Sequence, residues 1–193
     1  VAQRTEAYLA SGKRRPCLAV VLVGDDPASA IYVANKKKDC ESAGIESREY
    51  RFPPAMDEAS LLALIDTLNA DNSVDGILVQ LPLPQHIEER RVTERILPSK
   101  DVDAFSAVNV GSITLGRSGF KPCTPAGIMR LLSEYGIDAR GKECVVIGRS
   151  NIVGKPMALL LLASHGTVTV CHTATRDLSA HTSTADIVVV AAG

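Results

Sequence analysis

Two runs of apolar residues place the strongest constraint on how this chain can fold. LAVVLVG at 18–24 and GILVQL at 76–81 are apolar almost throughout, and most of their side chains are branched. A strand with one face in water alternates apolar and polar residues, whereas a strand of a parallel sheet is covered on both faces. The two runs therefore predict buried parallel strands and an α/β fold.

Helical patterns alternate with strand-like patterns along the rest of the chain. A helix over about 28–43 is expected after the first strand, with Ser29 as a candidate cap and Gly44 at its end. Alternation of this kind gives parallel sheets joined by right-handed crossovers. Further strands are expected at 47–52, 143–147, 167–171 and 186–191, and further helices at 2–11, 58–70, 86–96, 126–135, 154–164 and 177–184.

One long segment, 100–125, interrupts this alternation. It has little periodicity and ends on two closely spaced prolines, Pro122 and Pro125, so we expect it to be irregular. Loops of this length in compact domains are usually functional or connect domains. The sequence thus predicts two lobes of the βαβ type, divided as 1–121 and 122–193.

Composition narrows the class of protein. The net charge is −1, so no bulk field favours nucleic acid or an anionic membrane. The longest apolar run, MALLLLA at 157–163, is too short to span a bilayer, and no signal peptide is evident. The five cysteines contain no C-x-x-C and the four histidines no metal-binding spacing, so we expect reduced thiols, no bound metal and a cytosolic location.

A glycine-containing turn follows the strand at 143–147. Gly148 would allow a sharp turn and the close approach of a phosphate, and Gly154 would let the next helix lie near the strand. The amides at that helix start would then face a diphosphate. Because the spacing is G-x5-G rather than G-x-G-x-x-G, an ordinary strand-to-helix turn remains an alternative.

The charges near this turn indicate which nucleotide it would bind. Sites for NAD usually place an acidic residue at the end of the second strand, where it binds the ribose 2′-hydroxyl. Here that strand ends VCHTATR at 170–176, without an acid, and Arg149 and Thr173 are available instead. A cation and a hydroxyl suit a 2′-phosphate, which predicts NADP rather than NAD. Taken alone, Arg149 is better interpreted as a solvated surface charge.

Polar residues in the first half of the chain form a second candidate site. Tyr32 and Lys36 are four residues apart, so they share one face of a helix. Gln80 interrupts an apolar strand near its carboxyl end, where open α/β sheets bind ligands. Asp101 and Asp103 follow in KDVDAF. The alternatives are a solvated basic stripe for Lys36 and its neighbours, a hydrogen bond to backbone for Gln80, and turn formation for Asp101.

Several strings resemble one known family: SAIYVANKK, DGILVQLPLP, KDVDAF, KPCTPAGI and VVIGRSNIVGKP. The chain is similar over nearly its whole length to the bifunctional methylenetetrahydrofolate dehydrogenase/methenyltetrahydrofolate cyclohydrolases. The resemblance implies an N-terminal folate-binding lobe and a C-terminal Rossmann-like lobe that binds NADP. It also implies oxidation of 5,10-methylenetetrahydrofolate to the 5,10-methenyl form, followed by hydrolysis to 10-formyltetrahydrofolate.

The resemblance also implies a role for individual residues. Lys36 corresponds to the catalytic lysine, Tyr32 to the tyrosine that stacks on folate, and Gln80 to the glutamine beside the lysine. Asp103 corresponds to the aspartate that binds the amino edge of the pterin. The implied nucleotide contacts are Gly148, Arg149, Ser150, Ile152, Val153, Gly154 and Thr173.

Members of this family are typically cytoplasmic homodimers of one-carbon metabolism that serve purine, histidine and methionine synthesis. Two features depart from the family pattern. Ala104 stands where a glycine usually follows D-V-D, and family chains continue well past a strand such as IVVVAAG at 187–193. An incomplete nucleotide sheet would give weak dehydrogenase turnover. A monofunctional NAD-linked dehydrogenase and a non-catalytic folate-binding or dimerising module are the alternatives.

Overall fold

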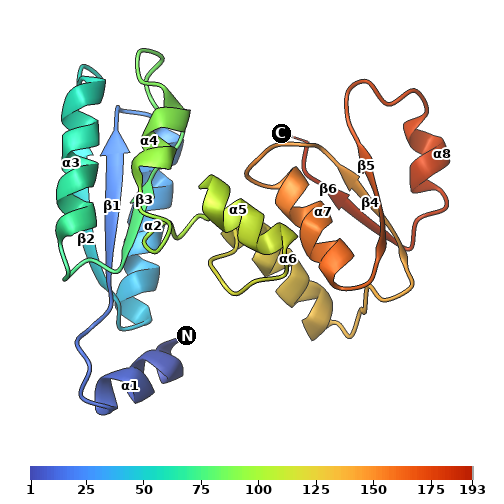
Figure 1. Cartoon of the computed structure of the whole chain (residues 1–193), viewed down its shortest axis with the longest axis horizontal. Helices are drawn as coiled ribbons and strands as arrows, with labels where there is room; N and C mark the ends of the chain where they lie inside the picture. Colours follow the sequence, from blue (N-terminus) through green and yellow to red (C-terminus); the bar gives the residue numbers. More distant parts are fainter. Residues whose placement is uncertain (193) are drawn as a thin grey trace. The chain divides into compact units, whose positions relative to one another are not determined.

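Two three-stranded parallel sheets organise the computed structural model, which describes residues 1–192 (Figure 1). The chain divides into two compact units between Val102 and Asp103, and each unit holds one sheet. The predicted α/β class is confirmed. In the described part of the chain, no helix combines the length and apolarity needed to cross a bilayer.

The first unit is built on the sheet order β2-β1-β3. The chain passes from β1 to β2 on one side and then returns across β1 to β3 on the other. Such a reversal creates a topological switch point at the carboxyl ends of β1 and β3, where open α/β sheets bind ligands. The elements are α1 (Ala2–Ala10), β1 (Cys17–Val23), α2 (Pro27–Ser42), β2 (Glu46–Phe52), α3 (Glu58–Ala70), β3 (Gly76–Val79) and α4 (Glu89–Arg95).

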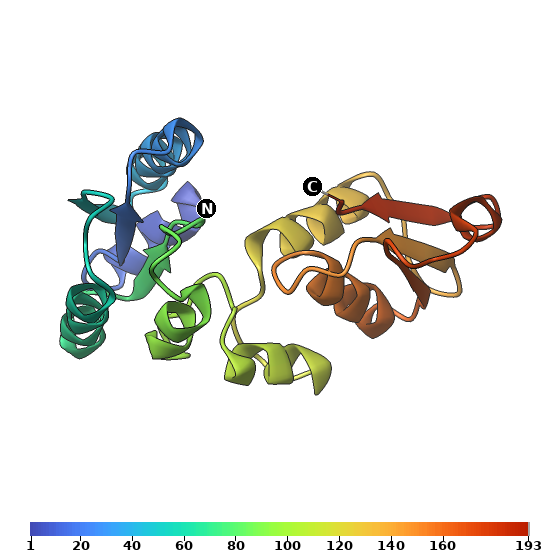
Figure 2. The ribbon, with the colours of Figure 1, turned by 90° about the horizontal axis from the view of Figure 1, so that it is seen from above.

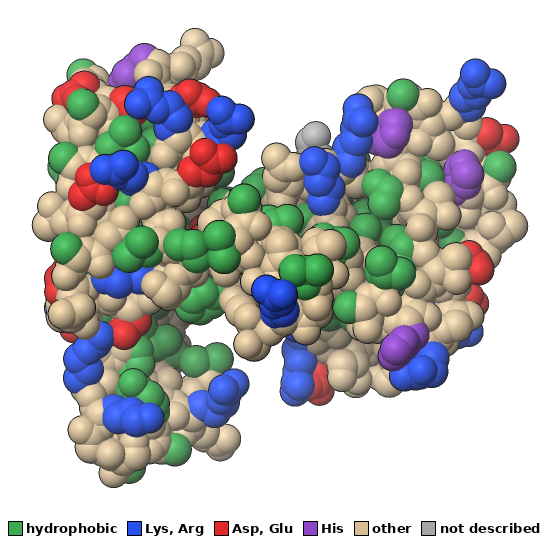
Figure 3. Space-filling model, viewed as in Figure 1, with side chains coloured by type: hydrophobic (Ala, Val, Ile, Leu, Met, Phe, Trp, Pro, Cys, Tyr) green, Lys and Arg blue, Asp and Glu red, His purple; other side chains and the backbone are tan. Residues whose placement is uncertain are grey.

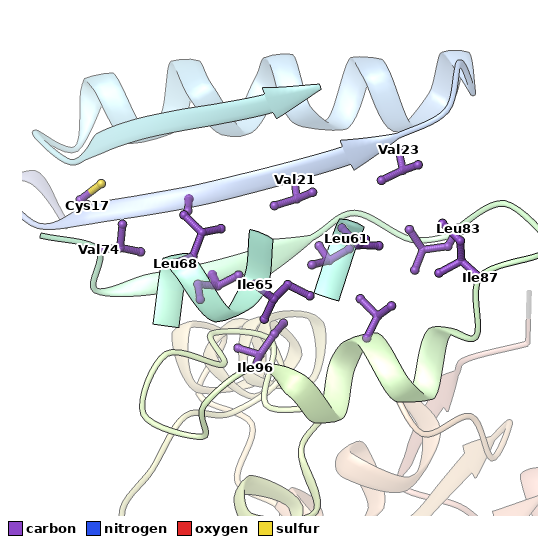
Figure 4. Close-up of a cluster of buried hydrophobic side chains, with 14 residues drawn as sticks. Cys17, Val21, Val23, Leu61, Ile65, Leu68, Val74, Leu83, Ile87 and Ile96 are labelled. Carbon is purple, nitrogen blue, oxygen red and sulfur yellow. The ribbon is translucent and has the colours of Figure 1, made fainter. Parts of the chain in front are cut away.

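Both faces of this sheet are covered, as the continuous apolar runs predict. Figure 2 shows α2 on one side of the sheet and α3 and α4 on the other. Figure 4 shows Val21 and Val23 of β1 together with Leu61 and Ile65 of α3 in the larger core. On the opposite face, Val33 of α2 belongs to the cluster that contains Val20, Leu22 and Leu78.

The start of α2 differs from the expectation. Asp26 is the cap, because its carboxylate accepts a hydrogen bond from the Ser29 amide at 2.7 Å. Pro27 occupies the first turn, where its missing N–H has no partner to lose. The prediction that Ser29 caps the helix is therefore wrong; Ser29 is a buried residue within it. The backbone hydrogen bond from Ser29 lowers the pKa of Asp26.

The second unit repeats the same topology in the order β5-β4-β6. Its core lies on one face of the sheet, where α6 and α7 cover Cys144 and Val146 of the central strand. The switch point of this unit lies between β4 and β6. The elements are α5 (Ala107–Thr114), α6 (Cys123–Glu134), β4 (Glu143–Ile147), α7 (Gly154–Ala163), β5 (Thr167–Cys171), α8 (Leu178–Thr182) and β6 (Ile187–Val190).

Helix α5 corrects the expectation that 100–125 is irregular throughout. Its sequence, AVNVGSIT, is poor in strong helix formers, so propensity alone does not reveal it. Ser106 caps the helix by accepting a hydrogen bond from the Asn109 amide at 3.2 Å, and Ile113 is buried. Packing of α5 against α7 places this segment in the second unit. The compact units therefore divide before the segment, whereas the sequence places the domain boundary at 121/122, after it.

Candidate active site and nucleotide-binding loop

A lysine and a glutamine from separate elements meet in the first unit. Lys36 Nζ on α2 donates a hydrogen bond to Gln80 Oε1, just after β3, at 3.3 Å. Gln80 Nε2 donates to the carbonyl of Leu81 at 2.7 Å. Because the Leu81 carbonyl can only accept, the NH2 end of the Gln80 amide faces it and the oxygen end faces Lys36. Both side chains are half-buried, so the amine is held in place while remaining accessible.

Tyr32 lies beside this pair. Lys36 Nζ is 5.6 Å from the centre of the Tyr32 ring, within the range of a cation–π contact. Tyr32 is 61% exposed, so much of its side chain is open to solvent. An exposed ring face next to a positioned amine is suited to stacking against a flat, polar ligand.

The loop that follows Gln80 is fastened to the start of α3. The ring Nε2 of His86 makes a 2.8 Å hydrogen bond with the carbonyl of Met56. The Glu88 amide donates to Glu58 Oε2 at 2.8 Å, and Glu58 also pairs with Arg91. These contacts hold the segment after β3 against the start of α3. The position of Gln80 therefore does not depend on the Lys36 contact alone.

The aspartates of KDVDAF have different surroundings. Asp101 is buried and forms a bridge with Ile77 beside β3, consistent with a structural role. Asp103 is half-buried and begins the second unit. Ala104, the departure from the family pattern, is fully buried with φ +56°. A left-handed conformation costs a residue with a side chain about 1–2 kcal/mol, so this position has the geometry of a glycine.

Close backbone contacts require both glycines of the turn after β4. Gly148 has φ +122°, and a Cβ added there would lie 2.3 Å from the carbonyl oxygen of Ala191. A Cβ on Gly154 would lie 2.3 Å from the carbonyl oxygen of Gly148. The Gly148 amide donates to Cys171 at 2.8 Å, which joins the turn to the end of β5. The strand, the turn and α7 thus pack against one another without room for side chains.

The hydroxyl of Ser150 occupies two of the backbone amides that were expected to be free at the start of α7. Its hydroxyl oxygen accepts from the amides of Val153 at 3.2 Å and Gly154 at 3.3 Å. Within residues 1–192, the backbone amides of 149–152 make no hydrogen bond. An anion approaching this helix would therefore meet the amides of 149–152 and the Ser150 hydroxyl. The amides of Val153 and Gly154 already have a partner.

Arg149 and Thr173 follow neighbouring strands. Ile147 pairs with Cys171 in the parallel ladder of β4 and β5, so the two loops leave the sheet at the same edge. Both side chains are exposed, as is Ile152, and neither Arg149 nor Thr173 makes a side-chain hydrogen bond among the described residues. Their placement leaves a guanidinium and a hydroxyl available to one anionic group.

Cysteine thiols and metal-ligating side chains are the other potentially reactive groups among the described residues. The five cysteines are free, and burial raises the pKa of the Cys17, Cys40 and Cys144 thiols, which makes them less nucleophilic. No group of three or more metal-ligating side chains is found among the described residues. On the face of the first unit seen in Figure 3, acidic and basic side chains are interspersed.

Comparison with known proteins relates these sites to a family. Residues 1–103 match the catalytic domain of tetrahydrofolate dehydrogenase/cyclohydrolase, and residues 122–193 match its NAD(P)-binding domain. The chain belongs to the tetrahydrofolate dehydrogenase/cyclohydrolase family. The resemblance seen in the sequence strings is confirmed, as is the expectation of a nicotinamide nucleotide domain.

Individual members of the tetrahydrofolate dehydrogenase/cyclohydrolase family are close in sequence. The bifunctional protein FolD of Methylibium petroleiphilum is 56% identical over 193 residues, which is 68% of its length. That of Acetivibrio thermocellus is 59% identical over 178 residues, which covers 92% of this chain and 62% of that protein. The chain thus spans about two thirds of the length of these relatives.

Solved structures of the family share this fold. The methylenetetrahydrofolate dehydrogenase/cyclohydrolase FolD of Campylobacter jejuni has a TM-score of 0.96 at 53% identity, covering 100% of this chain and 68% of that one. FolD of Trypanosoma brucei, solved with NADP and an inhibitor, has a TM-score of 0.94 at 34% identity, covering 100% and 66%. The roles assigned to single residues of this chain stay predictions.

Sequence reasoning missed several residues that support the two sites. The Leu81 carbonyl orients Gln80, and Ser150, predicted only as a nucleotide contact, accepts with its hydroxyl from the amides of Val153 and Gly154. Thr175 accepts a hydrogen bond from the His172 amide in the turn after β5. Ser150 and Thr175 each had a sequence signal, because a serine or threonine shortly after a strand end commonly makes local side-chain bonds to backbone.

Proposed function

We propose that this chain oxidises 5,10-methylenetetrahydrofolate to 5,10-methenyltetrahydrofolate with NADP and hydrolyses the product to 10-formyltetrahydrofolate. The observation that carries the proposal is the contact of Lys36 with Gln80 and Tyr32, in a segment that matches the family's catalytic domain. An amine held by an amide beside an exposed aromatic ring provides acid–base chemistry next to a flat binding surface.

Folate binding is assigned to three side chains. The Tyr32 ring stacks on the substrate, and Gln80 contacts it beside Lys36. The carboxylate of Asp103 accepts two N–H groups from the pterin edge, which sets the orientation of the ring system. The carbon to be oxidised is the substrate methylene between N5 and N10. NADP, when bound, accepts the hydride that leaves this carbon.

Lys36 serves in the hydrolytic step. Water attacks the methenyl carbon, and a group near that carbon must take up and return a proton as the ring opens. Lys36 is the titratable side chain positioned for this task, and the Gln80 oxygen directs its Nζ atom. Gln80 and Tyr32 are thus part of the catalytic group, because both touch the lysine and face the substrate.

Nucleotide binding is assigned to the loop after β4 and the turn after β5. The residues are Gly148, Arg149, Ser150, Ile152, Val153, Gly154 and Thr173. The unpaired amides of 149–152 suit a diphosphate, and the exposed Arg149 and Thr173 suit a 2′-phosphate, which favours NADP over NAD. We assign this domain to 122–193 and the folate-binding domain to 1–121.

The expected setting is the cytoplasm, as a homodimer in one-carbon metabolism that supplies purine, histidine and methionine synthesis. A net charge of −1 supports a small-molecule substrate rather than nucleic acid or a membrane surface. Light scattering coupled to size exclusion measures the oligomer directly. A monomer at micromolar concentration would exclude the dimer without affecting the assignment of the site.

The deciding experiment compares three lysines of one helix. Lys36→Met is expected to lower the rate of methenyltetrahydrofolate hydrolysis, measured without nucleotide, by about 100-fold or more, since acid–base groups typically contribute that much. Lys37→Met and Lys38→Met are the matched controls, because both side chains are exposed on α2. Hydrolysis that survives Lys36→Met unchanged would remove Lys36 from the mechanism.

A parallel experiment tests the nucleotide site. Arg149→Ala is expected to lower the ratio of NADP affinity to NAD affinity by about 10- to 100-fold, since the charge-assisted hydrogen bond that it removes is worth roughly 1.5–3 kcal/mol. Arg130→Ala, which removes an exposed arginine of α6, is the control. An unchanged ratio in Arg149→Ala would favour the NAD-linked alternative. Absence of hydrolysis in the unaltered chain would favour the monofunctional dehydrogenase, and absence of both hydrolysis and dehydrogenation would favour the non-catalytic folate-binding module.

A further inference from the structure

The four residues after β5 form a turn held by three hydrogen bonds. The His172 amide donates to Thr175 Oγ1 at 2.9 Å, and the Thr175 amide donates to the His172 carbonyl at 2.8 Å. The Ala174 amide donates to His172 Nδ1 at 3.2 Å. Thr173 lies inside the turn with its side chain exposed. The direction in which Thr173 points therefore depends on two neighbours that are not assigned to the nucleotide site.

This turn is tied to the glycine loop through the sheet. The Gly148 amide donates to the Cys171 carbonyl at 2.8 Å, directly before the turn. Arg149 directly follows Gly148 in the chain, and His172 directly follows Cys171. The peptide between Cys171 and His172 thus carries two contacts: its carbonyl accepts from the Gly148 amide and its amide donates to Thr175. We expect loss of the second contact to move the Thr173 hydroxyl relative to Arg149.

We propose that Thr175 is a positioning residue that sets the preference for a nucleotide carrying a 2′-phosphate. This inference rests on the proposed nucleotide site and adds a residue that does not touch the nucleotide. The Thr175 hydroxyl accepts from the His172 amide and keeps the turn closed, so that the Thr173 hydroxyl and the Arg149 guanidinium converge on one phosphate. His172 supports the same turn from inside by accepting from Ala174.

The test uses two ligands that differ only at the 2′-position: adenosine 2′,5′-bisphosphate and AMP. Isothermal titration of both ligands separates recognition of the 2′-phosphate from binding of the adenosine and 5′-phosphate. Thr175→Val keeps the shape of the side chain and removes the hydrogen-bond acceptor. We expect the affinity for the bisphosphate to fall about 3- to 10-fold, the size of one lost hydrogen bond, and the affinity for AMP to fall less than about 2-fold. Thr175→Ser, which restores the hydroxyl, is expected to recover the preference.

Controls separate this role from general damage to the unit. Thr167→Val makes the same change at the amino end of β5, where the side chain is exposed, and should leave both affinities unchanged. His172→Phe removes the acceptor for the Ala174 amide and should shift the preference in the same direction as Thr175→Val. It also provides the test if circular dichroism shows that Thr175→Val has unfolded.

The outcomes distinguish failure of this inference from failure of the site. If Arg149→Ala and Thr173→Ala lower the preference while Thr175→Val does not, the positioning role is wrong and the site stands. If Thr175→Val weakens both ligands equally, or Thr175→Ser fails to restore the preference, the role is also overturned. If Arg149→Ala and Thr173→Ala both leave the preference unchanged, the proposed 2′-phosphate site itself is wrong.

Discussion

Three glycines of the second unit provide a graded test of the backbone geometry that the nucleotide loop requires. Gly148→Ala is the severe case. Its φ of +122° is rare for residues with a side chain, at a cost of about 1–3 kcal/mol. The new Cβ would also lie 2.3 Å from the Ala191 carbonyl oxygen, and such overpacking typically costs about 1–3 kcal/mol. We expect the free energy of unfolding to fall by about 4 kcal/mol.

Two other glycines separate these contributions. Gly136→Ala meets no atom within 4 Å but has φ +68°, so it isolates the conformational cost, about 1 kcal/mol after the gain from a less flexible unfolded chain. Gly127→Ala lies within α6, has no positive φ and also has open space. It is expected to stabilise the unit by about 0.5–1 kcal/mol.

Urea unfolding monitored by circular dichroism measures the free energy of unfolding of the three variants and so ranks their stability. Hydrogen exchange of peptides from β4 and α7 shows whether the loss in Gly148→Ala is local to the turn. A domain typically has only about 5–15 kcal/mol of stability, so a loss of 4 kcal/mol is readily measured. A Gly148→Ala variant no less stable than Gly136→Ala would refute the close approach of Gly148 and Ala191, and with it the geometry of the loop.

Two further predictions concern the first unit. Ile65→Ala should lower the free energy of unfolding of the first unit by about 2–5 kcal/mol, measured by urea unfolding, because this residue of α3 is 0% exposed in the core. Leu62→Ala, at a partly buried position of the same helix, should cost less. Burial raises the pKa of Asp75, but the Arg14 side chain and the Cys17 amide outweigh it and lower the pKa below its ordinary value. A depressed pKa stabilises the fold above the unfolded pKa of about 4 and loses that contribution as pH falls through the folded value. Asp75→Asn should therefore be less stable than the unaltered chain at pH 7, with the difference shrinking below about pH 4; a gap that persists at acid pH would show that the carboxylate charge is not its source.

Much of the fold followed from sequence because its signals are local. The apolar runs at 18–24 and 76–81 predicted strands covered on both faces, and the clusters around Val21 and Val20 lie on opposite faces of β1. Helix α5 was missed because its residues are weak helix formers and its stability comes from Ser106 and from packing on α7. Propensity could not show a helix that tertiary contacts stabilise.

The candidate sites, like the fold, could be predicted only in part from the sequence. Sequence alone determined that Tyr32 and Lys36 share a helix face, that Gly148 and Gly154 flank a loop after a strand, and that an arginine rather than an acid stands near that loop. It also determined the family, because long strings of residues match. These are relations between positions close together in the chain, where the helical or strand period fixes direction.

Only the tertiary structure decided which groups touch across the chain. Lys36 and Gln80 are 44 positions apart, and their contact depends on β3 lying beside β1 with the Leu81 carbonyl orienting the amide. The Ser150 hydroxyl accepts from the amides of Val153 and Gly154, and the Thr175 hydroxyl accepts from the amide of His172. Sequence specifies the donors and acceptors, but only the folded backbone determines how they pair.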